Sequence, residues 1–207
     1  MNTHTIILAA GKGTRMNTNL PKVMQPLGGM SLIEHVISTA QEISKKITVV
    51  IGHQKNLLKE HLDEIDPIIE TVNQENQLGT AHAVKTASHL IQDDERVLIL
   101  YGDVPLISNK TIQSLLDSQN NCTLLSMILS DPTGYGRIVS NEENLALKII
   151  EQKDASEDER KIKEVFTGIL LIDGSLLRPA LEEINNQNAA NEYYLTDLVE
   201  ILSAKGV

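Results

Sequence analysis

Aromatic residues are scarce in this sequence, with no tryptophan, one phenylalanine and four tyrosines among 207 residues. Modules that bind nucleic acids by stacking bases on aromatic side chains are disfavoured, and we expect no nucleic-acid partner. Aliphatic side chains must therefore build the core. Cysteine is scarce too: Cys122 is the single one, which excludes an internal disulfide, and its apolar neighbours predict a core position.

Long apolar segments are also missing, since no apolar run is longer than about six residues. The start of the chain lacks the charged region and the apolar stretch of a signal peptide. We therefore expect a soluble, cytoplasmic protein with no membrane partner.

The distribution of charge is uneven along the chain. The formal net charge is −10, from 18 Lys and Arg against 28 Asp and Glu, yet residues 1–33 contain no acid. The same stretch holds Lys12, Arg15 and Lys22. An acidic chain with a short cationic stretch is suited to a compact anion rather than to a long polyanion such as DNA.

The first 120 residues alternate short aliphatic runs with helical patterns, which predicts a doubly wound, mostly parallel α/β sheet of the Rossmann-like kind. Ser31 and Glu34 form a capping box that opens one of the helices. Ligands of such a sheet bind at the carboxyl ends of its strands. The predicted strands are 5–8, 47–51, 68–72 and 97–101, and the later helices are 54–64, 79–90 and 108–120.

Beyond Cys122 the pattern changes to further strands, which we expect to extend the sheet and to form a β-rich lid on the substrate side. Linkers, repeats and low-complexity tracts are missing, which favours one domain. The predicted strands are 122–129, 137–139, 145–151 and 165–172, with a charged stretch at 153–164 and helices at 175–184 and 196–204.

A glycine-rich segment, 8–16, follows the first predicted strand. Gly11 and Gly13 allow close approach of the backbone to phosphate oxygens, and cations lie within the same segment. The spacing fits neither the Rossmann nor the Walker pattern. Two glycines after a strand also occur in ordinary turns, but Arg15 and Lys22 favour a phosphate site.

Asp103 follows the strand at 97–101 and places a carboxylate at its carboxyl end. Mg²⁺ typically takes one or two protein carboxylates and completes its octahedron with phosphate oxygens and water. A turn or helix-cap role is the alternative, and the neighbouring cationic loop favours the metal.

The segment 74–83 contains Gln74, Gly79 and Thr80 and opens a predicted helix. Side-chain amides and backbone N–H groups there can hydrogen-bond the edge of a nucleobase. A polar loop capped by Thr80 remains the alternative interpretation. The histidines show no paired metal-ligand spacing.

Seven segments together resemble the N-acetylglucosamine-1-phosphate uridyltransferase family, a branch of the sugar nucleotidyltransferase superfamily. Each segment alone also fits the wider superfamily, but their combination and order point to this branch. The segments are 8–16, 21–24, 77–82, 101–106, 134–138, 151–155 and 191–197.

The resemblance implies an Mg²⁺-dependent transfer of a uridylyl group from UTP to N-acetylglucosamine 1-phosphate. It implies one domain over 1–207, with nucleotide binding in 1–120 and sugar binding in 121–207. By resemblance, uridine contacts Leu8, Ala9, Ala10, Gly11, Gln74, Gly79 and Thr80; the triphosphate contacts the catalytic Arg15 and Lys22; ribose and Mg²⁺ lie at Tyr101, Gly102 and the metal ligand Asp103; and the sugar contacts Gly136, Glu151, Tyr194 and Thr196.

The chemistry implied in this way needs no general base, because a sugar 1-phosphate is already an oxyanion at neutral pH. Positioning and charge neutralisation must then supply the catalysis. We expect Arg15 to counter charge at the reacting phosphate and Lys22 to help hold the phosphates.

Two features depart from the family pattern. Phe166 stands where the family carries an asparagine that helps bind the sugar. Either the affinity for the sugar is lower, the pocket prefers another sugar, or nearby groups compensate for the lost polar side chain. The alternative is that Phe166 only fills space and has no effect on sugar binding. The sequence ends at Val207, before the family's second Mg²⁺ ligand and its trimer-forming β-helix acetyltransferase domain. A transferase for another sugar 1-phosphate, or a nucleotide-binding module with little activity, are therefore the alternatives.

Overall fold

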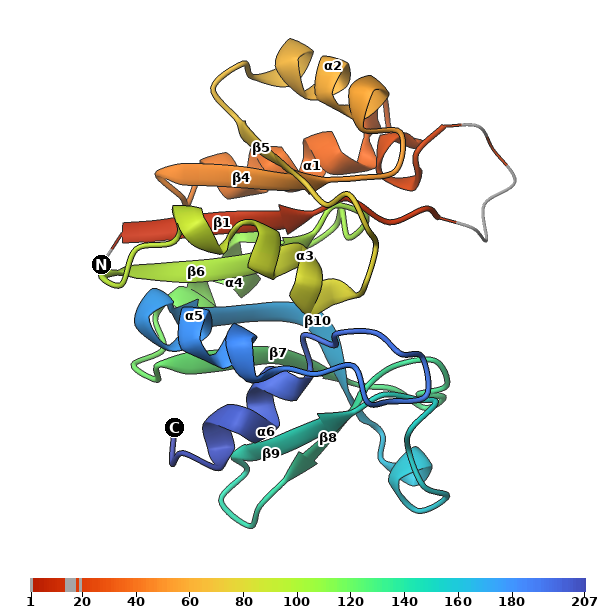
Figure 1. Cartoon of the computed structure of the whole chain (residues 1–207), viewed down its shortest axis with the longest axis vertical. Coiled ribbons are helices and arrows are strands. Elements are labelled where there is room, and N and C mark those ends of the chain that lie inside the picture. The colour runs from red at the N-terminus through yellow and green to blue at the C-terminus, as the bar shows by residue number, and fades with distance from the viewer. Residues whose placement is uncertain (1, 14–17, 19) are drawn as a thin grey trace.

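The computed structural model describes residues 2–13, 18 and 20–207. Its centre is an eight-stranded sheet, whose strands are stacked along the long axis of the molecule in Figure 1. Four of these strands pair in parallel in the order β5-β4-β1-β6, which confirms the predicted α/β fold with a parallel centre. They are β1 (Asn2–Leu8), β4 (Lys46–Ile51), β5 (Glu70–Asn73) and β6 (Glu95–Tyr101).

The order of the parallel strands defines where a ligand can bind. From β1 the chain moves outward to β4 and β5, and then returns to place β6 on the other side of β1. Leu8 at the end of β1 pairs with Tyr101 at the end of β6. The loops after these two strands therefore diverge from one point, where open α/β sheets form their ligand crevice.

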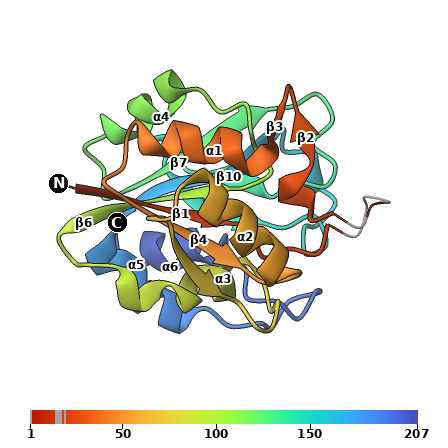
Figure 2. The ribbon, with the colours of Figure 1, turned by 90° about the horizontal axis from the view of Figure 1, so that it is seen from above.

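Helices cover both faces of the sheet because successive strand residues point to opposite sides. Ile6 packs in one apolar cluster with α3, α5 and α6, whereas Ile7 packs in a second cluster with α1, α2 and α4. Figure 2 shows α1 and α4 on one side of the sheet and α5 and α6 on the other. The helices are α1 (Leu32–Gln41), α2 (Lys55–Ile65), α3 (Thr80–Thr86), α4 (Asn109–Leu116), α5 (Gly174–Glu183) and α6 (Asp197–Ser203).

The capping box predicted at the start of α1 is present. The backbone N–H of Glu34 donates to Ser31 Oγ at 3.3 Å, and the Glu34 carboxylate accepts from the backbone N–H of Ser31. The helix buries Ile33, Val36 and Ile37. The local sequence thus determines both where this helix begins and which side faces the sheet.

The second half of the chain extends the sheet with antiparallel strands. These strands are β7 (Cys122–Ile128), β8 (Arg137–Ser140), β9 (Ala146–Ile150) and β10 (Glu164–Asp173). Strand β10 pairs with β6 through its last four residues and with β8 through Val165. Strand β7 pairs with both parts of β10, and the register of that pairing shifts between Phe166 and Leu170. Cys122 is partly buried against the first apolar cluster.

Some predicted boundaries differ from the structure. The helix expected at 79–90 divides into α3 and the 3-10 turn η2 (Ser88–Leu90), and the helix expected to reach residue 120 ends at Leu116. Short structures outside the main sheet are the 3-10 turns η1 (Lys22–Met24) and η3 (Glu159–Lys161) and the hairpin of β2 (Pro26–Leu27) and β3 (Met30–Ser31). Within the described residues, none of the helices combines the length and apolarity needed to cross a membrane.

Candidate functional site

The glycine-rich loop begins as a continuation of β1 that neighbouring strands hold from both sides. The backbone N–H of Ala9 donates to Val50 O at 2.9 Å, and the N–H of Gly102 donates to Leu8 O at 3.0 Å. A Cβ atom on Gly13, which has a φ of +57°, would lie 2.8 Å from Lys22 Cβ. The loop therefore packs against Lys22, and glycine at position 13 permits this approach. Arg15 lies outside the described residues.

A pocket of about 440 Å³ lies at the carboxyl ends of β1 and β6. It collects the predicted nucleotide residues from four separate parts of the chain, and we call it the nucleotide pocket after that prediction. Gly102 is an exception, since it is buried beneath the pocket and supports it through the bond to Leu8. The predicted residues that line it are Leu8, Ala9, Ala10, Gly11, Lys22, Gln74, Gly79, Thr80, Tyr101 and Asp103.

The same pocket contains residues that we did not assign to the site from the sequence. These are Val23, Gln77, Ala83 and Glu192, whereas Gly13, which also lines the pocket, was expected to approach phosphate oxygens. Gln77 and Glu192 do lie within the segments that carry the family resemblance, and that was the available signal. Their location at the pocket depends on contacts between segments more than one hundred residues apart.

Lys22 and Asp103 form an ion pair within the pocket through Nζ and Oδ2. Their side chains remain 43% and 26% exposed, so both can reach a ligand. Among the described residues, no group of three or more His, Cys, Asp and Glu side chains could hold a metal ion. The donor set therefore fits Mg²⁺ only as an ion held by Asp103 together with phosphate oxygens and water.

Gln74 is buried, with 3% of its surface exposed, and its side-chain amide is held on one side. Nε2 donates to Gly79 O at 3.1 Å and lies 2.9 Å from His82 Nδ1. Gln77 Nε2 donates to the backbone carbonyl oxygen of Gln74 at 2.9 Å. The predicted base-contacting amide is thus rigidly positioned at the wall of the pocket.

The loop before α3 and the first residues of α3 are hydrogen-bonded to the segment 193–195. The N–H of Ala81 donates to Tyr193 O at 2.9 Å, and the N–H of Tyr193 donates to Leu78 O at 2.8 Å. Thr80 Oγ1 accepts from the N–H of Leu195 at 2.9 Å. The interpretation of Thr80 as a helix cap is therefore wrong, because its hydroxyl joins two distant segments and α3 has no side-chain cap.

Tyr101 lines the nucleotide pocket and also lies within reach of the charge of Glu151, one of the predicted sugar residues. Burial, and then the negative charge of Glu151, raise the pKa of its hydroxyl, while a hydrogen bond with Thr80 opposes them and the charge of Asp103 adds to the rise. A Cβ atom on Gly168 would lie 2.7 Å from the Tyr101 ring, so this glycine permits close packing. Tyr101 therefore remains a neutral hydrogen-bonding group at neutral pH.

The predicted sugar residues, which we call the sugar-side group after that prediction, gather around Glu151. Thr196 Oγ1 donates to Glu151 Oε1 at 3.1 Å, and a Cβ atom on Gly136 would lie 3.5 Å from the same oxygen. Burial is the main cause that raises the pKa of Glu151, opposed by the bond from Thr196. Burial and neighbouring carboxylates raise the pKa of Tyr194 to about 12. None of these four residues lines the nucleotide pocket.

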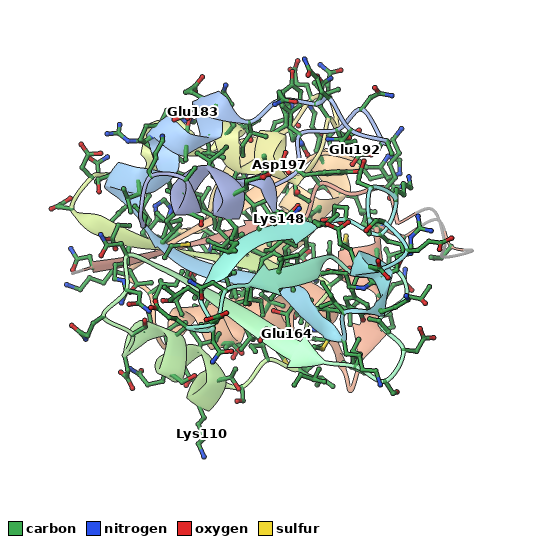
Figure 3. The ribbon with its side chains drawn as sticks, turned by 90° about the horizontal axis from the view of Figure 1, so that it is seen from below. Lys110, Lys148, Glu164, Glu183, Glu192 and Asp197 are labelled. Carbon is green, nitrogen blue, oxygen red and sulfur yellow. The ribbon has the colours of Figure 1, made fainter. Side chains whose placement is uncertain are left out.

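A second cavity of about 400 Å³ lies on the outer side of this group, between β9 and α6. Glu151 and Tyr194 line it together with Lys148 and Asp197, and Figure 3 shows Lys148 on β9 and Asp197 at the start of α6. Burial and the charge of Glu200 raise the pKa of Asp197 to about 6. The cavity is strongly acidic and so unsuited to a phosphate.

Phe166 belongs to the apolar core rather than to an open surface. Its side chain is 6% exposed and packs in the first apolar cluster with Ile138 and Ile149. Its N–H donates to Gly136 O at 2.9 Å, which ties it to the sugar-side group. Phe166 therefore fills space beside Gly136 and offers no polar side-chain atom there.

Comparisons with known proteins agree with this geometry. The bifunctional protein GlmU of Marinobacter nauticus is 43% identical over an aligned length of 207, which covers 99% of this chain and 45% of that protein. The chain thus spans less than half the length of this relative. A solved structure of UDP-glucose pyrophosphorylase complexed with UDP-glucose shares the fold, with a TM-score of 0.80 at 19% identity over 99% of this chain and 88% of the other.

The resemblance recognised in the sequence is confirmed by the family comparison as well. Residues 5–190 match the MobA-like NTP transferase domain. That match covers most of the nucleotide pocket and two of the four predicted sugar residues, Gly136 and Glu151, and the family transfers nucleotidyl groups. The chain therefore belongs to the MobA-like NTP transferase domain family and is a nucleotidyltransferase.

Proposed function

We propose that this chain transfers a uridylyl group from UTP to N-acetylglucosamine 1-phosphate, with Mg²⁺ as cofactor. The observation that carries the proposal is the pocket at the ends of β1 and β6, which combines a glycine loop, the Lys22–Asp103 pair and the Gln74 amide. The 43% identity to the GlmU protein supports the choice of substrates. In the same proposal, residues 1–207 form one domain, with the nucleotide side in 1–120.

The phosphates of UTP would lie over the glycine loop. The backbone at Gly11 and Gly13 can approach phosphate oxygens closely, and Lys22 supplies a positive charge beside them. Asp103 would hold Mg²⁺, which when bound supplies compensation for the phosphate charge. We retain Arg15 as the second cation on the grounds of sequence alone.

The reaction needs positioning rather than proton abstraction. A phosphate oxygen of the sugar 1-phosphate would bond to the α-phosphorus of UTP, while the bond from that phosphorus to the bridging oxygen breaks and pyrophosphate leaves with its electron pair. Both reactants are already ionised, so no general base is required. Lys22 would hold the phosphates in line and offset their mutual repulsion.

The sugar would occupy the far side of Tyr101. Glu151 presents a buried carboxylate that can accept hydrogen bonds from sugar hydroxyls, and Thr196 and Gly136 adjoin it. Tyr194 lies at the rim of the same group.

A second candidate is a uridylyl transferase for a sugar without the acetamido group. Phe166 favours it, because a buried phenyl ring beside Gly136 gives the acetamido group no polar partner. A nucleotide-binding module with little activity is the remaining alternative.

The test is pyrophosphate release by the 207-residue chain with UTP, with and without Mg²⁺, comparing N-acetylglucosamine 1-phosphate with glucose 1-phosphate. We expect Mg²⁺-dependent release with preference for the acetylated sugar. Release with glucose 1-phosphate alone would establish the second candidate. Calorimetric binding of UTP without release with either sugar would identify a binding module.

A further inference from the structure

The amide of Gln74 is held in one orientation by two acceptors. Its nitrogen carries two hydrogens, one directed to Gly79 O at 3.1 Å and the other to His82 Nδ1 at 2.9 Å. The hydrogen bonds among the described residues include none to Gln74 Oε1. Since Gln74 is nearly buried and lines the nucleotide pocket, its oxygen is the polar atom left for a ligand.

His82 can accept this hydrogen bond only when Nδ1 carries no proton, which requires the neutral ring with its hydrogen on Nε2. Burial, and then the charge of Lys85, lower the pKa of His82, so the ring is neutral at neutral pH. The ring lies 6.4 Å from the Tyr193 ring at a tilt of 37°, and Tyr193 is itself bonded to Leu78 and Ala81. His82 is therefore a fixed acceptor rather than a mobile surface group.

We propose that His82 is a positioning residue that selects uracil over cytosine by holding the Gln74 amide with its oxygen toward the base. Uracil carries a hydrogen on N3 that an amide oxygen can accept. Cytosine carries a lone pair at N3, which would face that oxygen and be repelled. The inference rests on the proposed uridylyl transfer and adds the residue that enforces its base specificity.

Without His82, the preference of the Gln74 amide for this orientation weakens. The remaining acceptor, Gly79 O, still favours the nitrogen on its side, but one amide hydrogen loses its partner. A turned amide would present its nitrogen to the base, and that donor suits N3 of cytosine. Discrimination between the two bases should therefore fall, even where overall affinity falls for both.

The test compares kcat/KM for UTP and for CTP in the wild-type chain and in three variants. His82→Ala removes the acceptor, and His82→Asn supplies an oxygen close to the position of Nδ1. His89→Ala is the matched control, because His89 is an exposed histidine on η2 outside the pocket. Calorimetric dissociation constants for UTP and CTP give the same ratio without requiring turnover.

We expect the preference for UTP to fall about tenfold in His82→Ala, to recover in His82→Asn and to stay unchanged in His89→Ala. General damage to the fold would lower both activities and leave the ratio constant. If the wild-type chain prefers UTP and His82→Ala keeps that preference, the role of His82 is wrong, while the proposed uridylyl transfer stands. Equal use of UTP and CTP by the wild-type chain would overturn the uridylyl assignment together with this inference.

Nitrogen NMR of the wild-type chain tests the same geometry without any substitution. The spectrum should show His82 as the neutral tautomer with its hydrogen on Nε2 at neutral pH. A hydrogen on Nδ1 would contradict the proposal, because that atom would then be a donor facing another donor.

Discussion

At the scale of single residues, Lys22 and Asp103 form an ion pair, and we propose that Lys22 binds phosphates whereas Asp103 binds Mg²⁺. Asp103→Asn removes the carboxylate charge but keeps the shape of the side chain. We expect turnover at saturating UTP to fall about a hundredfold, because charge stabilisation at the reacting phosphates is lost. Pyrophosphate release measured across a range of Mg²⁺ concentrations checks this, since the variant should also need more Mg²⁺.

Asp117→Asn provides the control for Asp103→Asn. Asp117 directly follows α4 and accepts a hydrogen bond from the Gln113 side chain, and it does not line the nucleotide pocket. Its substitution should leave the Mg²⁺ dependence unchanged. Wild-type turnover and Mg²⁺ dependence in Asp103→Asn would refute the metal-ligand assignment.

At the scale of elements, the hydrogen-bonded contact between the loop before α3 and the segment 193–195 depends on Gly79. Its φ of +121° is unfavourable for other residues, and a Cβ atom there would lie 2.4 Å from Tyr193 O. We expect Gly79→Ala to lower the free energy of unfolding by about 2–4 kcal/mol, from backbone strain and the clash together. Urea unfolding measures this change.

Gly29→Ala separates the two causes, because Gly29 has a φ of +96° but no atom of the described residues lies within 4 Å of the added Cβ. It lies in the β2–β3 hairpin and should cost about 1 kcal/mol from strain alone. Equal losses in the two variants would mean that the contact with Tyr193 contributes nothing. Gly79→Ala should also weaken UTP binding, whereas Gly29→Ala should not.

At the scale of the whole molecule, a buried polar network lies at the end of the sheet opposite the nucleotide pocket. His4 on β1 is fully buried, with Nδ1 2.9 Å from Glu95 Oε1 on β6 and Nε2 2.8 Å from Thr48 Oγ1 on β4. Burial is the main cause that lowers the pKa of His4, although Glu95 opposes it. The network thus joins three strands around a neutral imidazole.

Protonation of His4 should therefore destabilise the fold. The folded pKa lies below the unfolded value of about 6.5, so the contribution is fully present above that pH and is lost as pH falls through the folded pKa. Unfolding free energies of the wild type should drop below pH 6.5, with a His4 contribution of at most about 1.4 kcal/mol per pH unit. Urea titrations between pH 5 and 8 measure this slope.

His4→Gln is the comparison for the pH titration. The variant should be less stable than the wild type at pH 7.5, but its stability should decline less steeply below pH 6.5. Other groups with shifted pKa values, such as Asp197, are present in both proteins and cancel in the difference. Parallel pH curves for the two proteins would contradict the role assigned to His4.

Local sequence predicted the elements well where one pattern dominates. The strand expected at 97–101 lies within β6, and Ser31 and Glu34 begin α1 as expected. The helix predicted over 79–90 was too long, because α3 ends at Thr86 and a separate 3-10 turn, η2, leads to the buried Ile91. Boundaries of this kind depend on tertiary packing, which a local pattern does not contain.

The sequence by itself determined the α/β class and most of the residues that line the pocket at the ends of β1 and β6, while phosphate binding by the first loop stays a prediction. Polar residues after buried strands must emerge at one edge of a parallel sheet, and that rule needs no tertiary detail. Only the tertiary structure decided that β10 lies beside β6, that Tyr193 packs against Gly79 and that His82 is hydrogen-bonded to the Gln74 side chain. These contacts join distant segments or rely on side-chain orientation, and their free energy comes from burial and hydrogen bonding in the folded chain.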